Sequence, residues 1–230
     1  TYPMDPNISD EFGANFDVGF RRRTESFQFD FSVYCLLYKE RIGLIPAIVE
    51  APPPIFQKAI FLRNNLNDAR TLGIELSISK QIELDDAMIH CGGSIGIARG
   101  QYVDGDSPIQ GNELEFVPDY TCRGNVMFTK DRWNIQLHGA LTGKQFTDAT
   151  NAEYTPTAVY GEIPAYAILD FGLDRQIGEG DFSLGLKLNN LTDSRYFTRR
   201  ALAYPGPGIL PADGFNTRVA LTYAPAHDSC

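Results

Sequence analysis

Hydrophobic and polar side chains alternate with a period of two along most of the chain, which is typical of β-strands with two unlike faces. In residues 12–20, for example, Phe16 and Val18 alternate with Asp17 and Gly19. No segment shows a convincing helical period. The pattern therefore predicts an all-β protein of about nine strands, near residues 12–20, 27–37, 71–79, 89–98, 118–129, 133–146, 165–176, 181–191 and 214–223.

The connections between these strands alternate between short and long. In an up-and-down antiparallel sheet, every second connection lies at the same end. One end is therefore expected to carry tight turns and the other long loops, as outer-membrane barrels do. The short links fall at 23–24, 84–86, 130–131 and 178–180, and the long ones at about 42–67, 102–114, 147–164 and 198–213.

Strand length and face chemistry favour a transmembrane β-barrel over a soluble sandwich. Several strands reach the roughly 9–11 residues that cross a bilayer, whereas sandwich strands run about 5–6. Their second face carries Gly, Ser, Asn and charged residues, which suits a wet lumen. Trp133, Tyr166, Tyr196 and Phe197 are expected at the membrane interfaces. A soluble β-sandwich that binds carbohydrate is the less favoured alternative.

Composition narrows the possible functions. The 230 residues carry a net charge of -9, which argues against a general nucleic-acid binder. The cysteines form no CxxC motif and have no histidine at metal-ligand spacing, so neither a metal site nor a cofactor is expected. Cys35, Cys91 and Cys122 fall on the lipid-facing register, where a thiol behaves as a small hydrophobe. His90 and His138 fall on the polar face, and no nucleophile–base pair indicates an enzyme.

Six segments resemble, in order, the C-terminal half of TonB-dependent outer-membrane receptors, most closely the ferric-siderophore and ferric-citrate type. The most specific is "NNLTDSRYF" (189–197), which is similar to the family's hallmark near the penultimate strand. The others are "PNISDEFGANFDVGFR" (6–21), "ARTLGIELSIS" (69–79), "LEFVPDYTCRGNVMF" (114–128), "LTGKQFTDATN" (141–151) and "IPAYAILDFGLDRQ" (163–176).

The resemblance implies that residues 1–223 are about nine C-terminal strands of a 22-stranded, antiparallel up-and-down barrel. Such a barrel lies in the outer membrane of a Gram-negative bacterium, with its tight turns in the periplasm. Residues 224–230 are expected to form a disordered or non-native tail. An N-terminal plug domain, through which TonB acts, is expected outside this chain.

The resemblance also implies a transport function: binding and import of a ferric siderophore or ferric-citrate-like chelate with TonB-coupled energy. The partners are then the chelate, outer-membrane lipid and lipopolysaccharide. A small passive pore or structural barrel is the alternative function. Ligand contacts are expected at Lys144, Gln145, Arg199, Arg200 and Tyr204, because a guanidinium fork matches planar oxygen pairs of anionic chelates. The two arginines could instead pair with loop acids or lipopolysaccharide phosphates.

Overall fold

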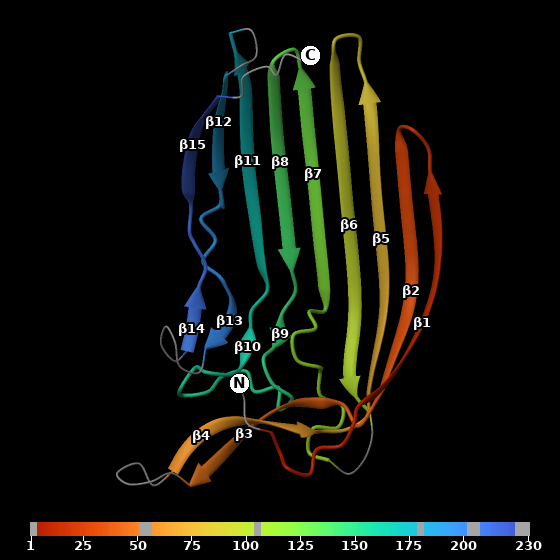
Figure 1. The fold of residues 1–230 in the computed structure, drawn as a ribbon, viewed down its shortest axis with the longest axis vertical. Helices are drawn as coiled ribbons and strands as arrows, with labels where there is room; N and C mark the ends of the chain where they lie inside the picture. The colour runs from red at the N-terminus through yellow and green to blue at the C-terminus, as the bar shows by residue number, and fades with distance from the viewer. Residues whose placement is uncertain (1–3, 51–56, 104–106, 179–181, 202–207, 224–230) are drawn as a thin grey trace, which may run out of the picture.

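Nine long antiparallel strands form one sheet, in which each strand pairs only with its neighbours along the sheet order (Figure 1). The computed structural model describes residues 4–50, 57–103, 107–178, 182–201 and 208–223. This part contains no helix long and apolar enough to span a membrane. The up-and-down order confirms the prediction. The strands are β1 (Phe12–Arg23), β2 (Phe27–Lys39), β5 (Ala69–Glu83), β6 (Ala87–Tyr102), β7 (Tyr120–Lys130), β8 (Trp133–Thr142), β11 (Tyr166–Ile177), β12 (Phe182–Asn189) and β15 (Asn216–Tyr223).

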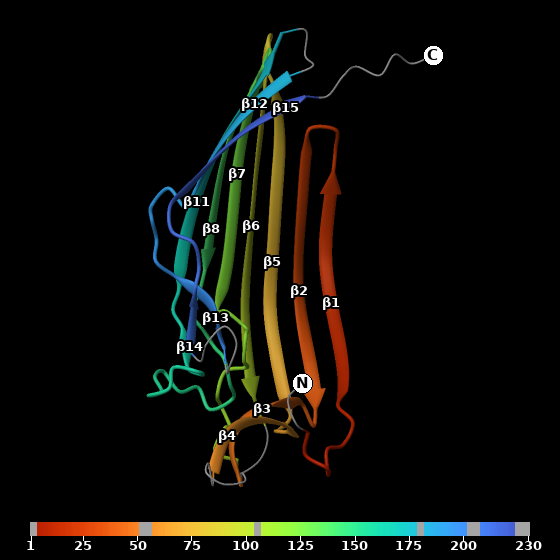
Figure 2. The same ribbon diagram turned by 60° about the vertical axis from the view of Figure 1, so that its left-hand side comes forward.

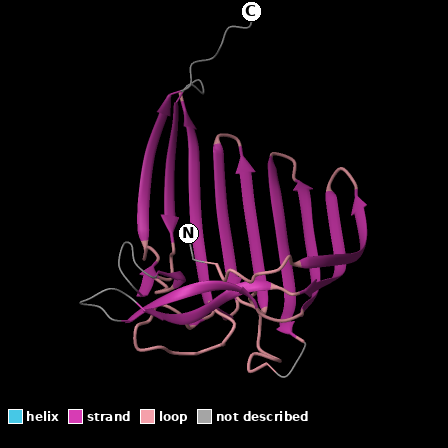
Figure 3. Ribbon diagram, turned by 60° about the horizontal axis from the view of Figure 1, so that its bottom comes forward, coloured by secondary structure: helices cyan, strands magenta, loops and turns pink. Residues whose placement is uncertain are grey.

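Three short hairpins lie within the long connections, where the sequence pattern predicted only loops. They gather at one end of the sheet, here called the loop end, and the opposite end is the turn end (Figures 1, 2 and 3). The hairpins pair β3 (Ile42–Glu50) with β4 (Gln57–Asn65), β9 (Gln145–Phe146) with β10 (Glu162–Ile163), and β13 (Phe197–Ala201) with β14 (Gly208–Pro211).

The strand expected over residues 133–146 is two strands, so that prediction was wrong in its extent. β8 leaves the sheet after Thr142, and β9 then pairs with β10 instead of continuing alongside β11. The break falls at Gly143, whose N–H donates to the Tyr120 carbonyl at 2.8 Å. A Cβ at Gly143 would lie 3.1 Å from the Tyr120 ring, so the chain turns where only a glycine fits comfortably.

The pairing register separates an apolar outward face from a polar inward face, since residues directly opposite share a face. Phe16 pairs with Cys35, which pairs with Leu72, all on the outward face. On the inward face Ser94 pairs with Arg123. Cys91 and Cys122 also lie on the outward face, opposite Val126 and Ile95 respectively. The register therefore agrees with the alternation read from the sequence.

The outward face is covered by nothing in the described part of the chain. Val18 is 77% exposed and Val219 is 67% exposed. The buried hydrophobic cluster lies instead at the loop end, where it contains Ala69, Tyr102, Ile109, Leu114 and Ala149. A continuous apolar face of this size is not tolerated in water. It suits the hydrocarbon of a bilayer, in which paired strands leave no backbone group unsatisfied.

The aromatic residues expected at the interfaces divide between the two faces. Trp133 lies on the outward face at the turn end, as expected, with the Arg175 guanidinium 4.5 Å from its ring centroid. Tyr166 pairs with Thr142 on the inward face and stacks on Tyr196, with ring centroids 4.6 Å apart. The interface prediction was therefore wrong for Tyr166, because a shift of one residue reverses the face.

A glycine on the inward face makes room for a tyrosine ring on the neighbouring strand. Tyr34 of β2 pairs directly with Gly73 of β5. A methyl group at Gly73 would overlap the Tyr34 ring, whereas one at Gly124 would meet nothing closer than 3.9 Å. Close packing of this kind makes the position sensitive to a single added carbon.

We expect Gly73→Ala to lower the free energy of unfolding of the intact receptor by about 1–3 kcal/mol, the usual cost of overpacking. Gly124→Ala is the matched control and should be close to neutral. Denaturant unfolding in detergent, followed by fluorescence, measures both. Equal effects of the two substitutions, or no relief of the Gly73→Ala defect by Tyr34→Ala, would contradict the packing argument.

Candidate ligand-binding site

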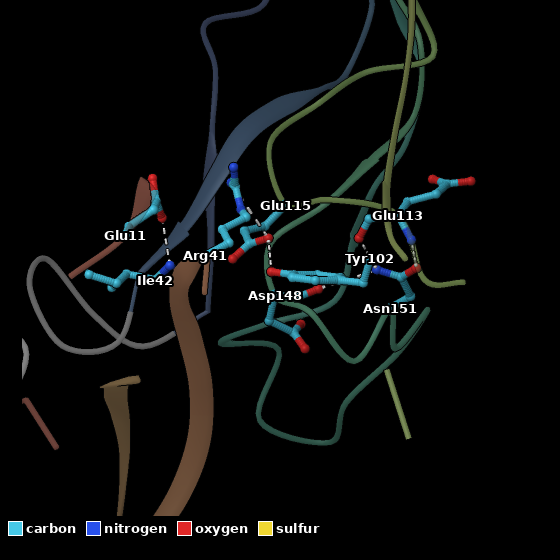
Figure 4. A network of polar contacts seen from close by, with 8 residues as sticks. All are labelled: Glu11, Arg41, Ile42, Tyr102, Glu113, Glu115, Asp148 and Asn151. Carbon is cyan, nitrogen blue, oxygen red and sulfur yellow. Dashed lines mark hydrogen bonds and ion pairs between the residues drawn. The ribbon is translucent and has the colours of Figure 1, made fainter. Parts of the chain in front are cut away.

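An asparagine side chain ties two loops together at the loop end (Figure 4). Asn151 Oδ1 accepts the Glu113 N–H at 2.6 Å, and Asn151 Nδ2 donates to the Glu113 carbonyl at 2.9 Å. The two residues belong to the β6–β7 and β8–β11 connections. Asn151 has a φ of 53°, a conformation that asparagine tolerates better than most residues. The Asn151 amide therefore bonds to both backbone groups of Glu113, as a paired strand would do.

A buried tyrosine and glutamate form a second contact between the loops and the sheet (Figure 4). The Tyr102 hydroxyl donates to Glu115 Oε2 at 2.8 Å, and Arg41 Nη2 lies 3.9 Å from the same oxygen. Both pair members are buried. Burial of the Tyr102 hydroxyl, together with the neighbouring Glu115 carboxylate, raises the pKa of Tyr102. Tyr102 lies at the loop end, beyond the apolar outward face of the sheet. The phenol therefore stays a hydrogen-bond donor. Arg41 also lies over the Tyr38 ring, 5.2 Å from its centroid.

The β8–β11 connection is closed by hydrogen bonds of its own. Asp148 is fully buried, and its Oδ1 accepts the Thr150 N–H at 2.9 Å. Its Oδ2 has no partner among the described residues. The Thr147 hydroxyl exchanges hydrogen bonds with the Gly161 backbone. The described residues contain no group of three or more His, Cys, Asp and Glu that could hold a metal ion.

The "NNLTD" segment forms a compact turn around Asn190, which is buried and has a φ of 51°. Its Nδ2 donates to the carbonyls of Ser194 and Asp213, and its Oδ1 accepts the Ser194 N–H at 2.9 Å. Its own N–H donates to Asp170 Oδ1 of β11 at 2.8 Å. The turn thus joins the end of β12 to the approach to β15.

Several open hollows lie on the inward face of the described sheet. One, of about 510 Å³, is lined by polar and basic residues that include Arg23, Gln28, His90, Arg123 and His138. The positions of both histidines agree with the predicted register. A second hollow, of about 310 Å³, lies nearer the loop end, and its lining includes Tyr34, Tyr38, Arg41, Glu75 and Phe116.

Sequence reasoning did not single out Tyr38, Arg41 or Phe116 as candidate site residues. Tyr38 occupies an inward position at the end of β2, so the rule that selects inward residues near long loops would have found it. Arg41 and Phe116 lie in the connections that follow β2 and β6. Their position depends on how these loops fold back, for which the sequence contains no periodic signal.

The structure places Lys144 and Gln145 at the foot of the β8–β11 connection. Lys144 Nζ lies 3.8 Å from Glu113 Oε1 and 4.9 Å from the Phe146 ring centroid. Gln145 pairs with Ile163 in the β9–β10 hairpin. Both side chains are partly exposed, so they are accessible from the loop end. Their role as ligand contacts stays a prediction.

The two predicted arginines differ in their surroundings. Arg199 is exposed on β13, whereas Arg200 is partly buried and donates to the carbonyls of Ala158 and Glu162 at 2.9 and 2.6 Å. Burial lowers the pKa of the Arg200 guanidinium. Arg200 therefore ties the β13–β14 hairpin to the β8–β11 connection, whereas Arg199 has no hydrogen-bond or ion-pair partner within the described part of the chain. Tyr204 lies outside the described residues.

Long paired strands, an uncovered apolar face and a polar inward face with hollows define the wall of a transmembrane β-barrel. Residues 1–191 match the family model described as "TonB dependent receptor-like, beta-barrel". The chain belongs to this family, whose members are transporters of Gram-negative outer membranes. A search of curated protein sequences gave no match.

Solved structures of this family share the fold at low sequence identity. The copper transporter OprC matches with a TM-score of 0.69 at 14% identity, over 96% of this chain and 33% of OprC. The ferric yersiniabactin uptake receptor FyuA from Yersinia pestis gives 0.67 at 20%, over 92% and 29%. The ferric citrate transporter FecA gives 0.68 at 15%, over 91% and 30%. The chain thus spans about a third of the length of these proteins.

We expect Asn151→Ala to speed hydrogen exchange at the Glu113 amide about fivefold, since a net hydrogen bond contributes about 1 kcal/mol. Asn151→Gly keeps access to positive φ and should show the same increase, which separates the lost amide from backbone strain. Hydrogen–deuterium exchange mass spectrometry of the intact receptor measures the effect. Gln110→Ala is the control, at an exposed site in the β6–β7 connection that also contains Glu113. Unchanged exchange in both Asn151 variants would show that the contact does not hold the loops.

Proposed function

We propose that the chain is part of the wall of an active outer-membrane importer that takes up a ferric siderophore or a ferric-citrate-like chelate. The observation that carries the proposal is the nine-stranded meander with an apolar outward face, a polar inward face and its long connections gathered at one end. The loop end would face the cell exterior and the turn end the periplasm. Energy would come from TonB through a plug domain.

The chemistry of the loop end supports an anionic chelate as the ligand. Arg199 is exposed on β13, while the hollow of about 310 Å³ combines Tyr38 and Phe116 with Arg41. Aromatic rings provide apolar contact area, and guanidinium groups bind carboxylate or hydroxamate oxygens in pairs. Two of the named structural relatives are proteins for ferric yersiniabactin and ferric citrate, and one is a copper transporter. These names support a metal complex as the transported ligand.

The test of the transport function is uptake of iron-55 chelates by cells that carry the intact receptor as their one route for the chelate. We expect uptake of a ferric siderophore or ferric citrate that stops when the protonmotive force is collapsed or TonB is deleted. Uptake that continues without energy would instead support the passive pore. Absence of uptake for every ferric chelate tested, with uptake of another metal complex, would overturn the proposed ligand class.

We expect Arg199→Ala to weaken chelate binding to the intact receptor about tenfold, because a hydrogen bond to a charged group contributes about 1.5–3 kcal/mol. Arg200→Ala should instead make the β8–β11 connection more susceptible to limited proteolysis, since Arg200 holds two of its carbonyls. Arg195→Ala, at a nearby exposed site, is the control for both readouts. Equal affinities of the Arg199→Ala receptor and wild type would remove Arg199 from the site.

A further inference from the structure

Three cations mark the loop-end border of the apolar outward face on three adjacent strands. Leu37 on β2 is followed, at the next outward position, by Lys39. On β5 Leu72 adjoins Arg70, and on β6 Ile97 adjoins Arg99. The pairings place all six on the outward face, since Arg70 is opposite Leu37 and Arg99 is opposite Leu72. The side chains of Lys39, Arg70 and Arg99, here called the basic border, are exposed.

The basic border follows one level of the membrane. The last apolar outward residue of β2, Leu37, is opposite Arg70 of β5, so the last one of β5, Leu72, lies two residues farther from the loop end. The last one of β6, Ile97, is opposite Ile74 and so lies two residues farther again. The border of the apolar face thus moves by two residues at each strand, as strands tilted in a bilayer require. Arg70 is a diagonal neighbour of both Lys39 and Arg99, at a Cα separation of about 7–8 Å. Long, flexible cationic side chains can therefore converge on a single head group.

Aromatic rings flank the basic border on both sides. Phe12 of β1 pairs directly with Lys39, and Tyr120 of β7 pairs with Ile97. Both rings are substantially exposed. β1 and β7 lie next to β2 and β6 in the sheet, so the patch is complete within the described strands. Exposed aromatic residues beside cations are typical of the head-group level of a membrane.

None of the ion pairs found among the described residues includes Lys39, Arg70 or Arg99. The nearest acid in the same row is Asp68, whose Oδ1 accepts the Glu40 N–H at 3.0 Å. Counting Asp68 and the exposed Glu40, which directly follows Lys39, three cations lie against two carboxylates at this part of the border, although the whole chain carries a net charge of -9.

The other strands show that this arrangement is local. On β8, β11 and β12 the outward positions just beyond the apolar rows are Gly143, Ala165 and Asn190. At the turn end, Lys130 bonds to Asp86 and Arg175 stacks on Trp133. The turn-end border also has two exposed outward cations, Arg22 and Lys80, but they lie on strands separated by β2. Only at the loop end of the described strands are three outward cations diagonal neighbours on adjacent strands.

We propose that Lys39, Arg70 and Arg99 form a binding site for the phosphate groups of one lipopolysaccharide molecule, whose acyl chains pack on the apolar face below them. Guanidinium and ammonium groups form charge-assisted hydrogen bonds to phosphate. Each cation near an anionic lipid surface contributes about 1 kcal/mol, equivalent to about fivefold in affinity. The inference rests on the proposed outer-membrane location with the loop end outside.

The experiment titrates lipid A onto the intact receptor in detergent and counts bound lipid by native mass spectrometry. We expect Arg70→Gln/Arg99→Gln to weaken binding of bisphosphorylated lipid A roughly 30-fold, and added Lys39→Gln to bring the loss to the order of 100-fold. The matched control is Arg22→Gln/Lys80→Gln, two outward cations near the turn end, which should bind lipid A like wild type. Heat-modifiable migration on gels reports folding of each variant.

A second arm uses wild-type receptor alone, so that it does not depend on how the variants fold. Dephosphorylated lipid A should bind wild type about as weakly as bisphosphorylated lipid A binds the triple variant. Equal affinity for the two lipids, or equal losses in the border and control variants, would overturn the site. Membrane fractionation distinguishes failure of the lipid-binding site from failure of the proposed function. A receptor that does not reach the outer membrane would overturn the proposed location itself.

Discussion

The structure depends on the need to pair every backbone N–H and C=O that lies in hydrocarbon, where water cannot satisfy them. Nine long strands meet this need by pairing side by side in chain order, with seven of them bonded on both edges. The outer edges of β1 and β15 have no strand partner among the described residues. A sheet with such edges is complete in a membrane only when further strands close it into a barrel. The match to about a third of the length of related receptors agrees with this requirement.

The same constraint explains why the hydrophobic core is not beneath the sheet. Once the backbone is paired, an apolar side chain on the outward face is stabilised by lipid and needs no protein contact. The inward face, facing water, can then carry a charge such as Arg123 in the middle of a strand. The buried cluster around Tyr102 and Leu114 lies where the chain leaves the membrane, because only there must side chains bury one another.

Alternation of residue types allowed the nine strands and both faces to be predicted, since every strand has one lipid-facing and one wet side. The extent of the strands was less predictable. β8 ends at Thr142, and Gln145 pairs instead with Ile163 in the β9–β10 hairpin, a contact between residues far apart in the chain. Tyr166 was placed on the wrong face, since aromatic residues near a loop carry no register information of their own.

The candidate site was predictable in region but not in detail. Arg199 and Arg200 are neighbours of one type in sequence, yet only folding of the β8–β11 connection gives Arg200 its two carbonyl partners. Likewise, the sequence identified "NNLTD" as part of a family hallmark near the penultimate strand, but the contacts of Asn190 with Ser194 and Asp213 depend on the returning chain. Loops have no repeating pattern from which such contacts could be inferred.

Asn151 and Asn190 have the same structural role at two places on the loop end. Each adopts positive φ and uses both polar atoms of its amide to satisfy backbone groups. Both atoms of Asn151 bond to Glu113 of another connection, whereas Asn190 bonds to Asp213 through Nδ2 and to Ser194 of its own turn through Oδ1. An amide that both donates and accepts can replace a missing strand pair, which a carboxylate or hydroxyl cannot do with the same geometry. The loops are therefore fixed to one another through their backbones. If the proposed function holds, ligand preference can change at exposed side chains such as Arg199 without loss of these contacts.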